Sequence, residues 1–304
     1  EDGIRDRSPS RGLGDVYKRQ VFMTLITSMV MFWLMDTDPF LAINAYFIEP
    51  DSTLDGVAEL LVKATPLILI ALGLSLGFQA NIWNIGAEGQ LTLGAIFSGG
   101  IALAYFDVDT PFLLPAMLVF GVLGGMFWEA IPAILKVRYN TNEILTSLML
   151  TYVGLLLLSY LIHGPLRDPD GFNFPESRLF HDSALLPIII EGSRLHIGFL
   201  LTLFIAVLTW ILLIKHIIGF QIRVIGMAPA AARFAGFKQK KLIWITLLFS
   251  GGAAGLAGAF EVSGPIGQIV PVISPGYGFT AIIVAFLGRL HPLGVVLAGI
   301  LMAL

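Results

Sequence analysis

The stretch TPLILIALGLSLGFQANIWNIGAEGQLTLGA, residues 65–95, places a polar and glycine-containing segment between two apolar runs. A membrane-spanning helix needs about 20 apolar residues, and runs of that length recur along the chain. The central segment NIWNIGAEGQ, residues 81–90, holds two Asn, one Glu, one Gln and two Gly. Because unpaired polar groups are costly in lipid, such a segment must be buried in protein or line a wet cavity. The stretch therefore predicts a helical membrane protein with an interruption that faces its interior.

The composition of the whole chain predicts the same class. Of its 304 residues, 56% are hydrophobic and 13% are charged, whereas soluble domains carry about 25% charged residues. We expect an all-α polytopic membrane protein with roughly eight to nine spans and broken or re-entrant segments. The expected spans lie near residues 21–35, 58–79, 91–106, 111–130, 144–162, 196–214, 242–260, 269–288 and from 293 onward.

The two ends of the chain differ from the rest. Residues 1–20, EDGIRDRSPSRGLGDVYKRQ, are charged and lack the order of a signal peptide. We interpret them as a non-native leader of the kind that a sequencing artefact produces; the alternative is a disordered basic tail. The apolar run 21–35 is short for a span, and the run from 293 stops without a polar cap. Residues 21–304 are therefore predicted to be one transmembrane domain, truncated at both ends.

The distribution of charge predicts the orientation in the membrane. The segment 215–241 holds six Lys or Arg and no acid, and the segment 36–56 holds five acids and no base. Basic loops stay on the cytoplasmic side, so 215–241 is expected inside and 36–56 outside. The loop 163–195 is then external. It is either a mobile loop or a surface for an external partner, with Phe172, Phe174 and Phe180 packed on the membrane surface.

A second interrupted segment lies at EVSGPIGQIVPVISPGYGF, Glu261–Phe279, where Pro265, Pro271 and Pro275 prevent a continuous helix. Interrupted apolar segments in comparable positions of two halves indicate a substrate path near the membrane midplane. The two interruptions therefore predict binding or passage of a solute.

The polar residues of these segments are suited to binding. Asn81, Asn84 and Gln90 offer neutral donors and acceptors for hydroxyls and for nucleobase or sugar edges. Glu88 either caps the helix that begins at Gly89 or Gln90 or lines the path, and Glu261 has the same two interpretations. No catalytic constellation is visible, so no catalytic residue and no enzymatic activity are predicted. Without Cys, and with five scattered His, no metal site or cofactor is expected.

Small residues recur along two predicted helices. The pairs Gly251/Gly255 and Ala254/Gly258 have the spacing that lets helix backbones approach closely. They indicate either plain helix packing or packing that slides during a transport cycle.

The basic loop contains a short predicted helix, APAAARFAG, with Pro229 at its start and Gly236 after its end. Apolar Ala232, Phe234 and Ala235 around Arg233 suit a groove in a soluble cytoplasmic partner. The chain has no Walker A motif. If transport uses ATP, the nucleotide site must therefore be on another subunit.

Four segments in this order carry a family resemblance: residues 65–95, TNEILTSLMLTY, GMAPAAARFAG, and SGGAAGLAGAFEVSG followed by SPGYGFTAIIVAFLGRLHPLG. They resemble the permease subunits of bacterial ABC importers in the branched-chain amino acid/simple-sugar superfamily. The NIGAEGQ variant is similar to the nucleoside-type branch, which basic-membrane-protein-like lipoproteins serve. Trp83 stands where these permeases commonly have Phe.

The resemblance implies partners for the chain. These are ABC ATPase subunits, a second permease subunit of the same or a different sequence, an external substrate-binding protein or lipoprotein, and the lipid bilayer, with no nucleic acid. It implies a multi-pass protein of the bacterial cytoplasmic membrane. It also implies that the segment Pro229–Gly236 (Pro229, Ala230, Ala232, Arg233, Phe234 and Gly236) docks on the ATPase. The candidate pathway residues become Asn81, Asn84, Glu88, Gln90, Glu261, Tyr277 and Phe279.

The function expected from the resemblance is a transmembrane path for nucleosides or related sugar-like solutes in an ATP-driven importer. One alternative is a simple-sugar permease. Another is an ion-coupled secondary transporter in which Glu88 or Glu261 carries the proton.

Overall fold

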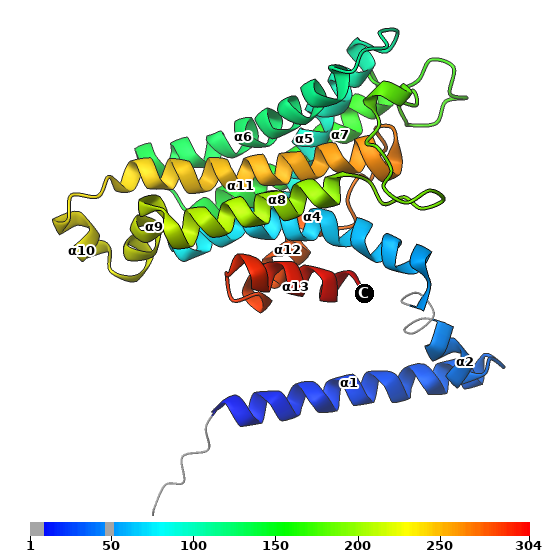
Figure 1. The fold of residues 1–304 in the computed structure, drawn as a ribbon, viewed down its shortest axis with the longest axis horizontal. Helices are drawn as coiled ribbons and strands as arrows, with labels where there is room; N and C mark the ends of the chain where they lie inside the picture. The colour runs from blue at the N-terminus through cyan, green and yellow to red at the C-terminus, as the bar shows by residue number, and fades with distance from the viewer. Residues whose placement is uncertain (1–8, 46–51) are drawn as a thin grey trace, which may run out of the picture. The chain divides into compact units, whose positions relative to one another are not determined.

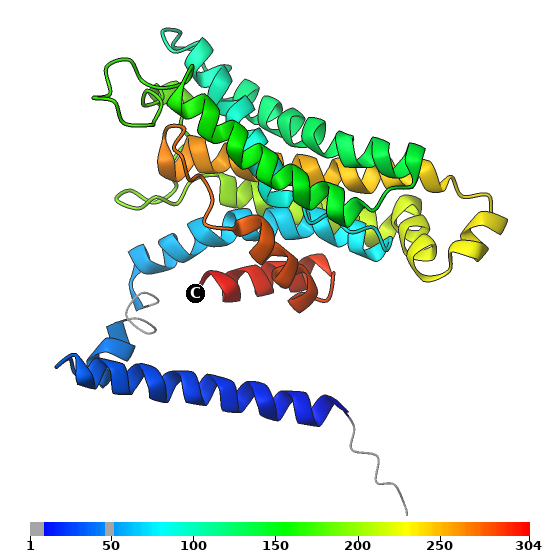
Figure 2. The ribbon, with the colours of Figure 1, turned by 180° about the vertical axis from the view of Figure 1, so that it is seen from behind.

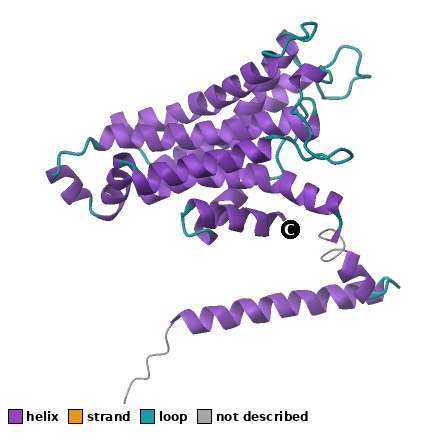
Figure 3. Cartoon of the chain, viewed as in Figure 1, coloured by secondary structure: helices purple, strands orange, loops and turns teal. Residues whose placement is uncertain are grey.

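The computed structural model describes residues 9–45 and 52–304, with side chains from Phe22 onward. Within these ranges the regular elements are helices joined by loops (Figure 3), together with one antiparallel bridge between Ile188 and His196. The predicted all-α class is confirmed. Glu49 and Asp51, two acids of the predicted external segment, lie outside the described residues.

The chain divides into two compact units, Glu1–Val57 and Ala58–Leu304. The first contains α1 (Pro9–Leu34) and α2 (Pro39–Ile43). The predicted span 21–35 forms the second part of α1, which begins inside the predicted leader. The non-native origin of that leader stays a prediction. Helix α2 begins where the Asp38 carboxylate accepts a hydrogen bond of 2.9 Å from the Phe40 N–H.

The second unit is a helical bundle (Figures 1 and 2). Its long helices are α4 (Leu54–Gln79), α5 (Ala87–Ala104), α6 (Leu113–Tyr139), α7 (Glu143–His163), α8 (Gly198–Trp210) and α11 (Gln239–Glu261). The shorter elements are η2 (Asp182–Ala184), α9 (Ile217–Met227), α10 (Pro229–Phe234), α12 (Tyr277–Leu287) and α13 (Pro292–Ala303). Two π-helical turns, η3 (Ile211–Lys215) and η4 (Val262–Ile266), extend α8 and α11.

In the described part of the chain, five helices are long and apolar enough to cross a membrane: α4, α6, α7, α8 with η3, and α11 with η4. The most apolar window of α4 is 83% buried, whereas that of α7 is 22% buried. Helix α4 therefore belongs to the interior of the bundle, and α7 presents most of its surface outward. This arrangement fits the apolar exterior that a bilayer requires.

Glycines bring the backbones of α5, α6 and α11 together. A Cβ atom on Gly125 of α6 would overlap the carbonyl of Gly251 on α11, and one on Gly255 would overlap the carbonyl of Gly121. Helix α5 joins this contact through Gly94, which lies against Gly255. The prediction that Gly251 and Gly255 serve close helix packing is confirmed.

The loop between α7 and α8 is tied to the second interrupted segment. The Leu186 N–H donates to the Ser263 carbonyl at 2.7 Å, and the Phe180 N–H donates to the Gly267 carbonyl at 2.8 Å. Phe180 is buried in the core. The expectation that Phe180 packs on the membrane surface was therefore wrong. Phe172 and Phe174 are 94% and 62% exposed, and their packing on the membrane surface stays a prediction.

The bundle has two distinct ends. Figure 1 places α9 and α10 at one end and the loop that follows α7 at the other. This separation agrees with the charge pattern that predicted 215–241 on the cytoplasmic side and 163–195 outside. The orientation itself stays a prediction.

The last helices are shorter than the spans predicted for them. The span expected at 269–288 is helical only from Tyr277 to Leu287. Pro271 and Pro275 precede that helix, and residues 267–276 are irregular because proline cannot continue a helix. Gly276 has φ 104°, a left-handed conformation that glycine adopts at no steric cost, directly before α12.

Candidate functional site

The two interrupted segments meet at the first turns of α5 and α12. The Glu88 carboxylate, in the first turn of α5, accepts a hydrogen bond of 2.6 Å from the Gly278 N–H of α12. The Ser274 hydroxyl accepts a second bond, of 2.9 Å, from the Tyr277 N–H. Two N–H groups that a helix start leaves without intrahelical partners are thereby satisfied.

Glu88 caps a helix, but not the helix that the sequence predicted. Helix α5 begins at Ala87 rather than at Gly89 or Gln90, and the Glu88 carboxylate reaches α12 instead of its own N-terminus. The side chain is 4% exposed. Its proximity to Gly278 depends on glycine, because a Cβ atom there would overlap the Glu88 backbone.

Asn84 and Gln90 form a second buried polar group directly beside this junction. The Asn84 amide N–H₂ donates to the Gln90 side-chain oxygen at 2.8 Å and to the Ser250 hydroxyl at 2.9 Å. The Asn84 side-chain oxygen accepts from the Gly86 N–H at 2.8 Å. Both amides are 1% exposed, so their hydrogen bonds go to protein groups, as buried polar groups require.

Glu129 on α6 completes this buried group, and sequence reasoning missed it. Its carboxylate accepts a hydrogen bond from the Gln90 amide, and its other oxygen has no hydrogen-bond partner. The residue stands in the apolar run GMFWEAIPAIL and is 1% exposed. A single acid in an apolar helix marks a functional candidate, and this signal was available at Glu129 as it was at Glu88.

Asn81 ends α4 rather than lining the buried group. Its φ of 57° is the left-handed conformation that closes helix C-termini. The Ile82 N–H then donates to the Gly77 carbonyl at 2.9 Å. The exposed Asn81 side-chain oxygen accepts from the Trp83 indole at 3.2 Å. Asn81 therefore orients Trp83.

An aromatic group lies next to this turn. The rings of Trp83 and Phe286 stack with centroids 5.6 Å apart, and those of Phe78 and Phe286 with centroids 5.0 Å apart. Phe279 stands seven residues before Phe286 on α12, so both lie on one helix face. Phe279 and Phe286 are 39% and 44% exposed. This face presents aromatic surface outside the bundle core.

Glu261 and Tyr277 lie near Arg194 of the loop between α7 and α8. The hydrogen bond that Arg194 donates to Glu59 raises the pKa of the Arg194 guanidinium, and the electrostatic interactions with Glu261 and Tyr277 add to that rise. Arg194 and Glu59 form a two-pronged ion pair, with nitrogen–oxygen distances of 2.8 and 2.5 Å. Glu261 is 6% exposed. Sequence reasoning missed Glu59 and Arg194, the charged residues whose ion pair lies near Glu261.

The predicted pathway residues thus separate into four places. Asn84, Glu88 and Gln90 form the buried junction, Asn81 lies in the exposed turn, and Glu261 lies toward the loop between α7 and α8. Tyr277 begins α12, directly before the Gly278 of the junction. Phe279 faces outward on α12. The junction joins the first turn of α5 to the first turn of α12. The outward aromatic face of α12 is accessible to a solute or to another subunit.

The short helix in the basic loop is present as predicted. It is α10, Pro229–Phe234, with Pro at its first position and Gly236 at φ 76° after its end. Ala232 is fully buried, whereas Phe234 is 95% exposed and Arg233 is also exposed. Helix α10 therefore packs on the bundle through Ala232 and exposes the side chains of Arg233 and Phe234.

A bundle of apolar helices with two broken segments and a short exposed helix at one end is the arrangement expected of a membrane permease. Residues 56–304 match the family described as branched-chain amino acid transport system / permease component. The chain belongs to this family. It is a multi-pass permease subunit of an ABC importer, a transport component rather than a catalyst, in the cytoplasmic membrane.

Three relatives illustrate the family. The chain is 37% identical over 295 residues to the glucose ABC transporter permease protein TsgB13 of Haloferax volcanii, covering 93% of this chain and 77% of that protein. It is 35% identical over 252 residues to the guanosine ABC transporter permease protein NupP of Bacillus subtilis, covering 81% and 71%. It is 27% identical over 289 residues to the nucleoside ABC transporter permease protein NupB of Lactococcus lactis, covering 92% and 79%.

Proposed function

We propose that this permease forms the transmembrane path for nucleosides. The observation that carries the proposal is the outward aromatic face of α12, where Phe279 and Phe286 lie on one side of the helix. Nucleobases stack on aromatic rings because every base has a π-face, and one stacked base contributes about 1–3 kcal/mol. Trp83, held by Asn81, adds a third ring beside this face.

The buried junction supplies the rigid support for this face. Glu88 fixes the start of α12, and Asn84 with Gln90 fixes the start of α5. Asn84, Glu88 and Gln90 therefore position the helices that line the path. Glu261 and Tyr277 lie at its external entrance. Two relatives named for guanosine and nucleoside transport support this substrate class.

ATP hydrolysis belongs to separate ATPase subunits that dock on α10. The exposed Phe234 and Arg233 form the contact, and the buried Ala232 transmits its displacement to the bundle. Closure of the ATPase pair pulls on α10 and rocks the helical halves between outward-open and inward-open states. A second permease subunit, of the same or a different sequence, forms the other half of the path.

An external substrate-binding protein or lipoprotein delivers the solute to the loop 163–195. This loop presents exposed Phe172 and Phe174 at the end of the bundle opposite α10. Since the external protein selects the solute, the affinity of the path itself can stay low.

The substrate test is uptake by proteoliposomes that hold the complete importer with its binding protein. Radiolabelled guanosine uptake should require ATP and should be competed by unlabelled nucleosides but not by glucose. Phe279→Ala should lower this uptake about tenfold, as expected for the loss of one stacking ring. Phe204→Ala is the matched control, because Phe204 is 59% exposed on α8.

Two outcomes contradict the proposal in different ways. Competition by glucose and not by nucleosides would establish the simple-sugar alternative, which the glucose permease relative favours. Uptake that survives ATP depletion but collapses with a protonophore would establish an ion-coupled carrier, with Glu88 or Glu261 as the proton site.

A further inference from the structure

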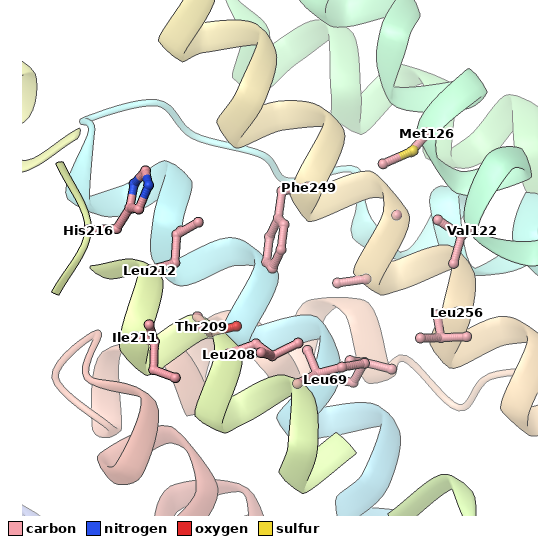
Figure 4. Close-up of a pocket in the computed structure, with 13 residues that line it drawn as sticks. Leu69, Val122, Met126, Leu208, Thr209, Ile211, Leu212, His216, Phe249 and Leu256 are labelled. Carbon is pink, nitrogen blue, oxygen red and sulfur yellow. The ribbon is translucent and has the colours of Figure 1, made fainter. Parts of the chain in front are cut away.

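An apolar groove of about 500 Å³ lies between α6, α8 and α11 (Figure 4). Val122 and Met126 come from α6, Leu208 and Leu212 from the α8–η3 helix, and Phe249 and Leu256 from α11. The groove is open on one side, and its walls are almost entirely hydrocarbon. A groove of this kind on a membrane protein accepts an apolar chain.

The end of the groove that the charge pattern places on the cytoplasmic side is basic. His216 lines this end, as Figure 4 shows, and Lys215 precedes it in the chain. The Lys215 ammonium lies 5.9 Å from the centroid of the Trp210 ring. Trp beside a basic residue at the end of a span marks the interface between hydrocarbon and headgroups.

Helix α11 contributes a second cation on the same side. Lys241 stands eleven residues before Gly252, a groove residue, so helical periodicity places the two on one face about three turns apart. The neighbouring Lys240 is rotated by about 100° around the axis of α11 and lies off the face that Lys241 and Gly252 share. No Asp or Glu occurs from residue 215 to 241, so the charge at this end of the groove is positive.

We propose that this groove binds one phospholipid with an anionic headgroup from the cytoplasmic leaflet. One of its two acyl chains lies between Met126, Leu208 and Phe249, and its phosphate faces Lys215 and Lys241. Basic pockets between membrane helices on the cytoplasmic side favour anionic headgroups. The volume suits a narrow chain better than a helix, whose diameter with side chains is about 10–12 Å.

The test uses the assembled importer in liposomes with a phospholipid that carries a photoactivatable diazirine in its acyl chain. Phosphatidylglycerol supplies the anionic probe, and phosphatidylcholine with the same acyl chain supplies the zwitterionic probe. We expect phosphatidylglycerol to label the peptides that contain Met126 and Phe249 at least about threefold more strongly. The double variant Lys215→Gln/Lys241→Gln should bring the two probes to equal labelling, while Lys240→Gln should preserve the preference.

A steric pair of variants tests the acyl chain separately. Leu208→Trp narrows the groove and should reduce labelling by both probes, whereas Val207→Trp should not. Leu208 and Val207 are 47% and 53% exposed on the same helix, and only Leu208 lines the groove. Each variant is scored on the fraction that co-purifies as an assembled complex, so loss of folding is not counted as loss of lipid.

Three results would overturn the proposal. Equal labelling of the native groove by both lipids would exclude a preference for anionic headgroups. Absence of label in the groove would exclude lipid binding there. A thiol crosslink from Met126→Cys to Met31→Cys within one chain, or between two copies carrying Met126→Cys, would identify a protein occupant. The chain has no native Cys to confuse these crosslinks.

Discussion

The carboxylate of Glu88 accepts a hydrogen bond of 2.6 Å from the N–H of Gly278, 190 residues further along the chain. This bond joins the two segments in which proline, glycine and polar residues interrupt apolar sequence. Each segment starts a helix, and the carboxylate of one first turn satisfies a donor of the other. The two interruptions are therefore one structural unit, and substitution at either residue acts on both.

Glu88→Ala should destabilise the permease more than Glu88→Gln. Alanine leaves the buried Gly278 N–H without an acceptor, which costs about 1–3 kcal/mol, whereas the glutamine side-chain oxygen can still accept. The midpoint of thermal unfolding of the purified importer in detergent measures the difference. Glu191→Ala, at an exposed carboxylate of the loop between α7 and α8, is the control. If both Glu88 variants unfold at the wild-type midpoint but fail to transport, the carboxylate acts on the solute rather than on α12.

Gly255→Val should disrupt the contact of α5, α6 and α11. A Cβ atom at Gly255 would overlap the Gly121 carbonyl and the Gly125 backbone. Backbone cannot move aside as a flexible side chain can, so we expect a loss of about 3 kcal/mol of unfolding free energy. Gly100→Ala on α5 is the control, because a Cβ atom there meets nothing within 4 Å. The yield of folded protein after detergent extraction and its unfolding midpoint measure the effect, and equal values for both variants would contradict it.

The sequence predicted much of this structure because helix formation and membrane insertion depend on local composition. Apolar length located the long helices, and Pro229 with Gly236 bounded α10. The two interruptions were also visible, since proline and clustered polar residues cannot sit in a lipid-facing helix.

The partners within the site were not predictable, because they depend on packing between distant segments. Asn84 bonds Ser250, 166 residues away, and nothing local in either segment indicates the other. Glu129 was a visible acid in an apolar run, but its bond to Gln90 needs the glycine contacts of α5 with α6. Composition also left open whether these amides face a solute or one another.

Phe234→Ala should weaken the association with the ATPase. Phe234 is 95% exposed at the end of the bundle that carries the basic loop, and such an isolated aromatic side chain is typical of a binding hot spot. Loss of about 2 kcal/mol corresponds to about 30-fold weaker binding, measurable by titration of the ATPase onto the permease in nanodiscs. Phe172→Ala is a closely matched control, since Phe172 is 94% exposed at the opposite end. Arg233→Glu should weaken the same contact. Unchanged ATPase binding by both variants would show that α10 is not the docking element.

Acid should destabilise the fold through His196. The imidazole is 2% exposed, and burial lowers its pKa to about 4 from an ordinary value of 6.5. Its Nδ1 atom accepts a hydrogen bond of 3.2 Å from the Gly198 N–H at the start of α8, a bond that only the deprotonated nitrogen can accept. Between pH 6.5 and 4 the unfolded chain binds a proton that the folded chain excludes, so this contribution to stability is fully present above pH 6.5 and is lost as the pH falls.

The expected loss from pH 7.5 to pH 5 is about 2 kcal/mol, or roughly 5 °C in the unfolding midpoint. Other groups titrate in this range, so the informative quantity is the difference between wild type and His196→Asn. Asparagine keeps a side-chain acceptor for the Gly198 N–H but carries no titrating proton. The variant should therefore lose about 5 °C less than wild type on acidification. Parallel midpoints for the two proteins across this range would show that the buried ring of His196 is not protonated on unfolding.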